Sequence, residues 1–174
     1  METKINLLSE NMIGLTWGFQ VNPVSCGNNT HYENYIRFIA ISDNKIGCGT
    51  THVLIGKEDD KEVLIGFVTL RASSFVVMEN DLAHGSSAIE IMELAVDQRY
   101  EKCGYGTKLI DYAIAVADEI NDAVMAVKYI VLCADSSAVA FYKSNGFERV
   151  SDYGYVPRNG ANDDCVPMIM RIRD

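Results

Sequence analysis

The clearest pattern of apolar and polar positions lies between residues 88 and 120. Residues 88–96 form a mostly apolar run, long enough for a central strand, after which the chain turns polar at Asp97 and meets two glycines. From residue 107 to residue 120 apolar side chains recur at helical spacing, with charged residues between them. The pattern therefore predicts a strand, a glycine-containing loop and an amphipathic helix, around which the rest of the chain is organised.

Further elements are predicted on both sides of this unit. On the N-terminal side the spacing indicates a helix over residues 30–41, and strands at 50–55 and 63–70 flank a polar connection at 56–61. On the C-terminal side follow a buried strand at 129–133, a short helix at 136–144 capped by Asp135 or Ser136 and stopped by Gly146, and strands at 147–155 and 167–172 joined by a polar stretch at 158–164. This order predicts a mixed α/β sheet with helices on its faces.

The length and composition fit one globular domain. The chain has 174 residues, of which 48% are hydrophobic, so residues 1–174 are expected to bury one core. No apolar run approaches the roughly 20 residues that span a membrane, and the start of the chain lacks the pattern of a signal peptide, which favours the cytoplasm. The cysteines are odd in number, widely spaced and without a Cys-x-x-Cys pair, so we expect thiols rather than a disulfide framework or a zinc site, and no metal. They are Cys26, Cys48, Cys103, Cys133 and Cys165.

The charge of the chain bears on its partners. The formal net charge is −9, and no two Lys or Arg residues are adjacent. Nucleic-acid-binding proteins usually carry a basic patch, so this balance counts against a polyanionic partner. It favours a cationic substrate such as an amine, although a solvated acidic surface gives the same balance.

The two glycines precede the predicted helix and suggest an anion site. Gly104 and Gly106 allow close approach of the backbone, and the free N–H groups of a first helical turn suit a pyrophosphate. Two familiar phosphate-binding motifs do not fit. The dinucleotide-binding fingerprint lacks its third glycine, because Leu109 occupies that position. The P-loop has a lysine before its Ser or Thr, whereas here Lys108 follows Thr107. An ordinary strand–turn–helix connection stays open as the alternative.

Two stretches of the sequence resemble a known enzyme family. Leu-Ala-Val-Asp at 94–97, followed by Tyr-Glu-Lys-Cys-Gly-Tyr-Gly-Thr at 100–107, resembles motif A of the GCN5-related N-acetyltransferases (GNAT), whose Gln/Arg-x-x-Gly-x-Gly/Ala loop binds the pyrophosphate of acetyl-CoA. Residues 138–147 resemble the Ala-x-x-x-Tyr-x-x-x-Gly-Phe helix and turn after the family's fifth strand. The resemblance covers the chain from about residue 66. Glu101 stands where the family has Gln or Arg, and its carboxylate would repel a pyrophosphate.

The resemblance implies a fold and a cofactor site. The expected sheet is mixed, mostly antiparallel and six- or seven-stranded, with strands four and five splayed to admit the pantetheine arm of acetyl-CoA. The unpaired backbone of the fourth strand would bind that arm, and the glycine loop would bind the pyrophosphate. The expected acetyl-CoA contacts are Leu94, Ala95, Val96, Glu101, Lys102, Cys103, Gly104, Tyr105, Gly106, Thr107 and Asp135.

The resemblance also implies direct attack of a primary amine on acetyl-CoA within a ternary complex. Tyr142 would be the general acid that protonates the departing thiolate, unless it is only a core aromatic packed with Phe141 and Phe147. Glu90 and Glu93 point to opposite faces of the central strand, so at most one faces the cleft; Glu93 is the candidate base, with a non-catalytic rim charge as the alternative. No histidine has a metal-ligand spacing or a nucleophile partner that would assign it a role: His31, His52 and His84.

A narrower resemblance concerns the acceptor. Residues 26–28, 49–54, 65–70 and 166–170 resemble the acetyltransferase toxins of bacterial toxin–antitoxin pairs, which acetylate aminoacyl-tRNA and are silenced by a ribbon–helix–helix antitoxin. Because the acidic charge opposes tRNA binding, the main hypothesis is an N-acetyltransferase for small-molecule or peptide amines, with the tRNA toxin as the alternative. A non-catalytic acyl-CoA-binding module is a further alternative. The protein partners to consider are an antitoxin and a second copy of the chain in a homodimer.

Overall fold

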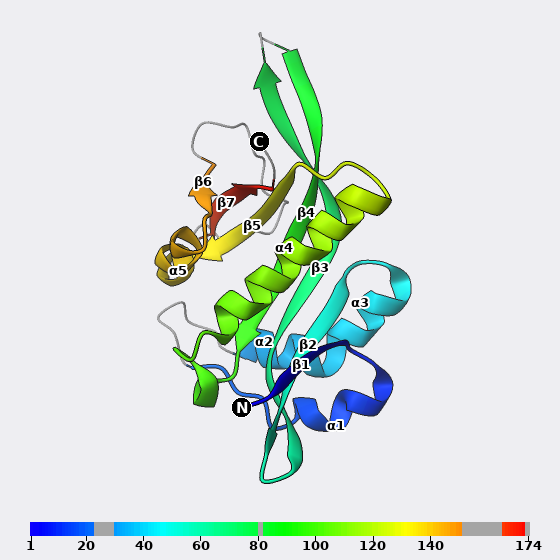
Figure 1. The fold of residues 1–174 in the computed structure, drawn as a ribbon, viewed down its shortest axis with the longest axis vertical. Coiled ribbons are helices and arrows are strands. Elements are labelled where there is room, and N and C mark those ends of the chain that lie inside the picture. The colour runs from blue at the N-terminus through cyan, green and yellow to red at the C-terminus, as the bar shows by residue number, and fades with distance from the viewer. Residues whose placement is uncertain (23–29, 80–81, 151–164, 173–174) are drawn as a thin grey trace. The chain divides into compact units, whose positions relative to one another are not determined.

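The fold is a mixed α+β arrangement built on a seven-stranded sheet (Figure 1). The structure is a computed structural model that describes residues 1–22, 30–79, 82–150 and 165–172. The strand order is β1-β2-β3-β4-β5-β7-β6. The pairs β1–β2, β2–β3, β5–β7 and β6–β7 are antiparallel, and β4 pairs with β5 in parallel. This confirms the predicted GNAT-like, mostly antiparallel sheet with flanking helices.

The chain forms two compact units, which are described separately. The first comprises residues 1–71 and 92–111, and the second comprises residues 72–91 and 112–174. That residues 1–174 form a single domain therefore stays a prediction.

The strands of the first unit extend the predicted hairpin. β1 (Thr3–Leu7), which the sequence did not predict, pairs with β2 (Thr50–Glu58), and β2 pairs with β3 (Lys61–Glu79). The connection is shorter than the predicted residues 56–61, because Asp59 and Asp60 alone form the turn, both with positive φ as two-residue hairpins require. The register shifts between Leu54 and Ile55 and leaves one extra residue in β3, which makes a β-bulge.

Helices of the first unit pack on these strands. The helical segments that precede β2 are η1 (Glu10–Met12), α1 (Ile13–Thr16), α2 (Thr30–Asn34), the π-helix Tyr35–Ile39 and α3 (Ala40–Ile46). The predicted helix at 30–41 is confirmed and is longer, because it continues to Ile46 and ends at Gly47 in the left-handed region. The buried core of this unit comprises Leu8, Phe19, Tyr35, Ile36, Ala40, Val53, Ile55, Leu64, Phe67 and Ala95.

The second unit centres on a parallel strand pair. β4 (Leu82–Val96) pairs with β5 (Tyr129–Asp135) over residues 88–91 and 129–132, and β5 pairs with β7 (Cys165–Arg171). The predicted splaying of β4 from β5 stays a prediction. α4 (Tyr105–Ala123) and α5 (Val139–Ser144) are the long and short predicted helices, and the 3₁₀ turn Ser136–Ala138 opens the latter.

The final strands differ from the sequence prediction. β6 contains only Glu148–Arg149, which pairs with β7, whereas a strand was predicted at 147–155. Residues 151–155 and the predicted polar connection at 158–164 lie outside the described residues. The second unit contains a small hydrophobic core cluster, made by Phe75, Ala88, Val131, Val150 and Ile169.

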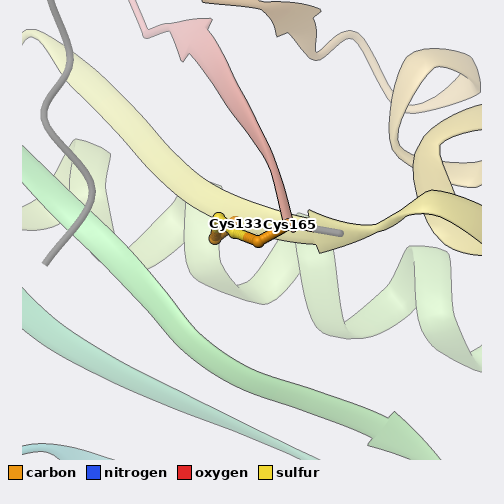
Figure 2. Close-up of a disulfide and its surroundings, with 2 residues drawn as sticks. All are labelled: Cys133 and Cys165. Atoms are coloured by element: carbon orange, nitrogen blue, oxygen red, sulfur yellow. A yellow bond between two sulfur atoms is a disulfide. The ribbon is translucent and has the colours of Figure 1, made fainter. Parts of the chain in front are cut away.

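Two cysteines are joined by a disulfide, which corrects the expectation that all are thiols. Cys133 on β5 and Cys165 on β7 are bonded, with their Cα atoms 5.5 Å apart (Figure 2). Cys133 lies opposite Pro167 and Cys165 opposite Asp135, so the two are diagonal neighbours across the ladder. Their separation of 32 residues hides this contact from the sequence. Cys48 and Cys103 are free and exposed, and Cys26 lies outside the described residues.

Candidate active site

The glycine loop leads into the N-terminus of α4. The helix begins at Tyr105, two residues before its predicted start, and its first backbone hydrogen bond runs from Lys108 N to Gly104 O at 3.0 Å. The N–H groups of the helix that precede Lys108 therefore have no hydrogen-bond partner within the helix. Lys102 and Gly104 have φ values of +59° and +82°, and alternating conformations of this kind build backbone concavities for anions. Because residues 102–104 are exposed, this end of α4 can receive a negatively charged group.

Glu101 at the start of the loop is fixed by the N-terminal segment. Its Oε2 atom accepts a hydrogen bond from Asn22 Nδ2 at 2.6 Å, and the side chain is partly buried. The neighbouring Val21 N donates to Glu33 Oε1 at 3.1 Å, which holds the same segment against α2. The carboxylate that departs from the family motif therefore has a structural partner, which the sequence did not indicate because Asn22 is 79 residues away.

Asp97 is a buried anchor between β4 and the loop. Its fully buried carboxylate accepts hydrogen bonds from Arg99 N (2.9 Å), Nε (2.8 Å) and Nη2 (3.1 Å) and from Gln20 N (3.1 Å). Its own N–H donates to Ile65 O, beside the bulge of β3, at 2.8 Å. Asp97 in turn raises the pKa of the Arg99 guanidinium. The sequence showed only a polar turn here, and an aspartate followed two residues later by arginine was the available signal.

Tyr100 lies buried just before the loop. Burial raises its pKa to about 12, and the nearby Glu58 carboxylate acts in the same direction. Glu58 is close enough for this electrostatic effect, yet the buried hydroxyl meets no partner in hydrogen-bond geometry within the described part of the chain. The Arg99 guanidinium carbon lies 5.1 Å from the centre of the Tyr100 ring, which adds a cation–π contact.

The segment Leu94, Ala95 and Val96 closes β4. Ala95 is 6% exposed and joins the core of the first unit, while Leu94 and Val96 are partly buried. A Cβ placed on Gly66 would lie 2.7 Å from Ala95 O. Gly66 therefore allows β3 to approach β4 closely at the segment expected to bind the pantetheine arm.

Glu93 has a partner that the sequence reasoning missed. His31 Nε2 on α2 lies 2.9 Å from Glu93 Oε1 on β4. The side chain of Glu93 is 15% exposed and that of His31 is 56% exposed. The two residues are 62 positions apart, so no local spacing could have linked them. Glu90 lies in the second unit, where it pairs with Val131.

Tyr142 and Asp135 belong to the second unit. Tyr142 on α5 is 8% exposed and makes edge contacts with Phe141 and Phe147, at centroid distances of 5.1 Å and 5.7 Å. These are the packing contacts named as the alternative to catalysis. Asp135 occupies the N-cap position of the 3₁₀ turn without a side-chain capping hydrogen bond. Gly146, with φ of +89°, follows α5 as the predicted stop.

Comparison with known proteins decides the family. A family model described as an acetyltransferase (GNAT) domain matches residues 38–149. The chain belongs to the GNAT acetyltransferase family. No curated protein sequence matches it.

Solved structures with the same fold as this GNAT protein include several toxins. A bacterial toxin matches with a TM-score of 0.76 at 21% identity, covering 98% of this chain and 91% of the other. A Tyr-to-Phe mutant of the toxin AtaT matches with a TM-score of 0.72 at 17% identity, covering 98% and 89%. A Tyr-to-Phe mutant of KacT matches with a TM-score of 0.73 at 15% identity, covering 99% and 96%. At these identities the likeness establishes the fold.

Neither a membrane-spanning helix nor a metal-binding cluster occurs among the residues that the structure describes. Within residues 1–22, 30–79, 82–150 and 165–172, no helix combines the length and apolar character that crossing a membrane requires. The same residues contain no group of three or more His, Cys, Asp or Glu side chains that could hold a metal ion.

Proposed function

We propose that this GNAT protein transfers the acetyl group of acetyl-CoA to the α-amino group of an aminoacyl-tRNA, as the toxin of a toxin–antitoxin pair. The observation that carries the proposal is the extent of the structural match. The family model begins at residue 38, whereas the bacterial toxin covers 98% of this chain. The N-terminal segment that fastens Glu101 and supplies His31 therefore has a counterpart in the toxin fold.

The complexes in which similar proteins have been solved support aminoacyl-tRNA as the acceptor. AtaT has been solved in complex with acetyl-methionyl-tRNAfMet and, as a mutant, with acetyl-CoA and the C-terminus of the antitoxin AtaR. KacTA has been solved as a complex with DNA. We therefore replace the main sequence hypothesis, a small-molecule or peptide amine, by its alternative, and we expect a ribbon–helix–helix antitoxin as partner.

The roles proposed for the residues follow the family motif. The pyrophosphate would be held by the N–H groups at the start of α4. The residues concerned are Glu101, Lys102, Cys103 and Gly104 of the loop and Tyr105, Gly106 and Thr107 of the helix. The backbone of Leu94, Ala95 and Val96, with Asp135, would hold the pantetheine arm and thioester. The positive φ of Lys102 and Gly104 and the exposed loop support this assignment.

The chemistry proposed needs an acid and a base. Tyr142 would give its phenolic proton to the departing thiolate, and Glu93 would belong to the group that removes a proton from the acceptor ammonium. A backbone N–H near Leu94 or Ala95 would stabilise the oxyanion that develops on the thioester oxygen. That both AtaT and KacT were solved as Tyr-to-Phe mutants is compatible with a functional tyrosine in this family.

Acetylation of another amine is the second candidate, favoured by the net charge of −9. The discriminating experiment supplies labelled acetyl-CoA to the purified protein with a bacterial extract and with total aminoacylated tRNA. Label should enter the RNA fraction and be released by mild alkali as an N-acetylamino acid. Label confined to protein or small molecules would reject the tRNA proposal.

The same assay tests Tyr142 with a matched control. Tyr142→Phe should lower turnover by about 100-fold or more and leave the Kd for acetyl-CoA within about two-fold. Tyr112→Phe on α4 removes a hydroxyl outside the proposed site and should retain activity. Binding of acetyl-CoA without transfer to any fraction would instead establish a non-catalytic module. In a bacterial host, expression of the wild type but not of Tyr142→Phe should arrest growth.

A further inference from the structure

The N-terminal strap, residues 16–22, is fixed on one side by the helical part of the first unit. Arg37 in the π-helix donates from Nη2 to Phe19 O at 2.7 Å and from Nε to Thr16 O at 3.3 Å. The Phe19 side chain is fully buried, and its ring meets the ring of Phe67 with centroids 5.5 Å apart. The strap is therefore anchored on the core of the first unit.

The other side of the strap is bonded to the segment that leads into the glycine loop. Gln98 N donates to Gln20 O at 2.8 Å, and Gln20 N donates to the buried Asp97 Oδ2 at 3.1 Å. Two residues further along the strap, Asn22 Nδ2 donates to Glu101 Oε2 at 2.6 Å. All of these residues belong to the first unit. Of these bonds, the one between Asn22 and Glu101 lies nearest in sequence to the glycines of the loop.

The loop holds a backbone conformation that a flexible chain avoids. Lys102 has a φ of +59°, a region that crowds the side chain of any residue other than glycine. Together with Gly104, whose φ is +82°, it forms the concavity proposed for the pyrophosphate. Glu101 directly precedes Lys102, so a hydrogen bond that fixes Glu101 limits the conformations open to the next residue. A loop that already has its binding conformation loses less freedom when the ligand binds.

We propose that Asn22 is a positioning residue of the acetyl-CoA site, which acts through Glu101 to hold the pyrophosphate loop in its binding conformation. This inference rests on the proposed function, because it takes the loop as the acetyl-CoA site. Glu101 then has two opposing effects on binding: its charge repels the phosphates, and its accepting oxygen orders the loop. Glu101→Gln keeps an accepting oxygen without the charge, whereas Glu101→Ala removes both.

The test is a double-mutant cycle on the full chain, with the Kd for acetyl-CoA measured by calorimetry. Glu101→Gln and Glu101→Ala are both neutral, so the difference between them reports the accepting oxygen and not the charge. Glu101→Ala should bind acetyl-CoA about three- to ten-fold more weakly than Glu101→Gln, as expected for the loss of one hydrogen bond. When each is combined with Asn22→Ala, the two should bind within about two-fold of each other, because the donor is absent. Asn22→Ala alone should weaken binding about three- to ten-fold.

Gln98→Ala is the matched control. It removes the side-chain hydrogen bond from Gln98 Nε2 to Gln20 Oε1, which is 2.9 Å long and joins the same strap to the turn before the loop. Because this bond does not reach the loop, the Kd for acetyl-CoA should stay within about two-fold of that of the wild type.

Kinetics and stability separate positioning from a purely structural role. With total aminoacylated tRNA as acceptor, Asn22→Ala should raise the KM for acetyl-CoA and leave kcat at saturating acetyl-CoA within about two-fold, because Asn22 takes no part in the proposed chemistry. A purely structural role would lower the urea midpoint and leave the Kd of the folded protein unchanged.

The negative outcomes have defined meanings. Equal affinity of Glu101→Ala and Glu101→Gln, or a difference that persists when Asn22→Ala is added, overturns the role of Asn22. A loss of affinity in Gln98→Ala as large as that in Asn22→Ala overturns it as well, because the effect would then belong to the whole strap. If Asn22→Ala folds poorly by circular dichroism, the comparison of the two single Glu101 variants decides by itself. A wild type that binds no acetyl-CoA refutes the proposed function together with this inference, whereas one that binds acetyl-CoA and acetylates no aminoacyl-tRNA refutes the proposed function alone.

Discussion

Replacing Gly66 by alanine tests the close approach of β3 to the end of β4. A Cβ at this position would lie 2.7 Å from Ala95 O, 3.1 Å from Leu109 Cδ1 and 3.4 Å from Val96 Cα. The first contact is about 0.7 Å shorter than the 3.4 Å at which ordinary contacts begin. Because the contacted atom is a backbone carbonyl, it cannot rotate away, and one of the two strands has to move.

The expected cost follows from this displacement. Moving the end of β4 away from β3 would lengthen the hydrogen bond from Asp97 N to Ile65 O, now 2.8 Å. Inserting a methyl group into a packed site costs about 1–3 kcal/mol, and the reduced freedom of the unfolded chain returns about 0.4–1 kcal/mol. We therefore expect Gly66→Ala to lower the free energy of unfolding by about 1–2 kcal/mol.

The assay is urea unfolding with a matched strand glycine as control. Gly85 lies on β4, and beyond its two chain neighbours no heavy atom of the described residues comes within 4 Å of an added Cβ. Gly85→Ala should therefore leave the unfolding free energy within about 0.5 kcal/mol. Acetyl-CoA affinity, measured by calorimetry, should fall in Gly66→Ala alone if Leu94, Ala95 and Val96 hold the pantetheine arm. Equal stability of the two variants would refute the close approach on which the reasoning rests.

The remaining predictions concern the groups around the loop. Asp97→Asn should lower the unfolding free energy by about 2–3 kcal/mol, because a neutral amide cannot match the bonds to Arg99 and Gln20 N; a urea midpoint equal to that of the wild type would contradict this. Glu101→Gln should tighten acetyl-CoA binding about two- to five-fold at low salt and less at high salt, whereas the exposed Glu119→Gln on α4 should not; calorimetry at two ionic strengths decides. Tyr100→Phe should stabilise the fold by up to about 1 kcal/mol, since it removes a buried hydroxyl without a hydrogen-bond partner among the described residues. The Tyr100 pKa of about 12 exceeds the ordinary 10, so the native state retains a proton that the unfolded state releases, and wild-type stability should fall between pH 10 and 12 more than that of Tyr100→Phe. The urea unfolding midpoints of the wild type and of Tyr100→Phe, each measured at both ends of this pH range, give that difference.

The long elements could be predicted because their signals are local. The helical spacing at 107–120 lies within α4, and the apolar run at 88–96 lies within β4. The boundaries were less predictable. Gly106 was taken as part of the loop but lies in the first turn of α4, and the polar residues Lys57 and Glu58 were taken as a turn but continue β2. In both cases hydrogen bonds to neighbouring backbone outweighed the local preference of the side chain.

The contacts within the candidate site could not be predicted from one sequence. His31 meets Glu93 across 62 residues, and Gln20 N meets Asp97 across 77. β1 escaped detection because five residues of irregular burial carry too little alternation. The Cys133–Cys165 bond depends on the register of β5 against β7, which no spacing of cysteines encodes. These features come from the fold, whereas the glycine loop and Tyr142 were visible as motif positions.

Glu101 illustrates why a motif position does not by itself define a role. The family places an amide or a cation here, and both can donate hydrogen bonds to a phosphate, whereas a carboxylate can only accept them. In this chain the carboxylate accepts from Asn22 Nδ2 at 2.6 Å, so the side chain fastens the segment that precedes α2. In the proposed pyrophosphate site, the loop would therefore bind phosphate through its backbone N–H groups rather than through the Glu101 side chain, and any sequence with the same φ values can present such N–H groups. The Glu101 side chain therefore has a structural partner at a position where the family motif has a phosphate-binding residue, and it links the loop to the N-terminal segment that precedes α2.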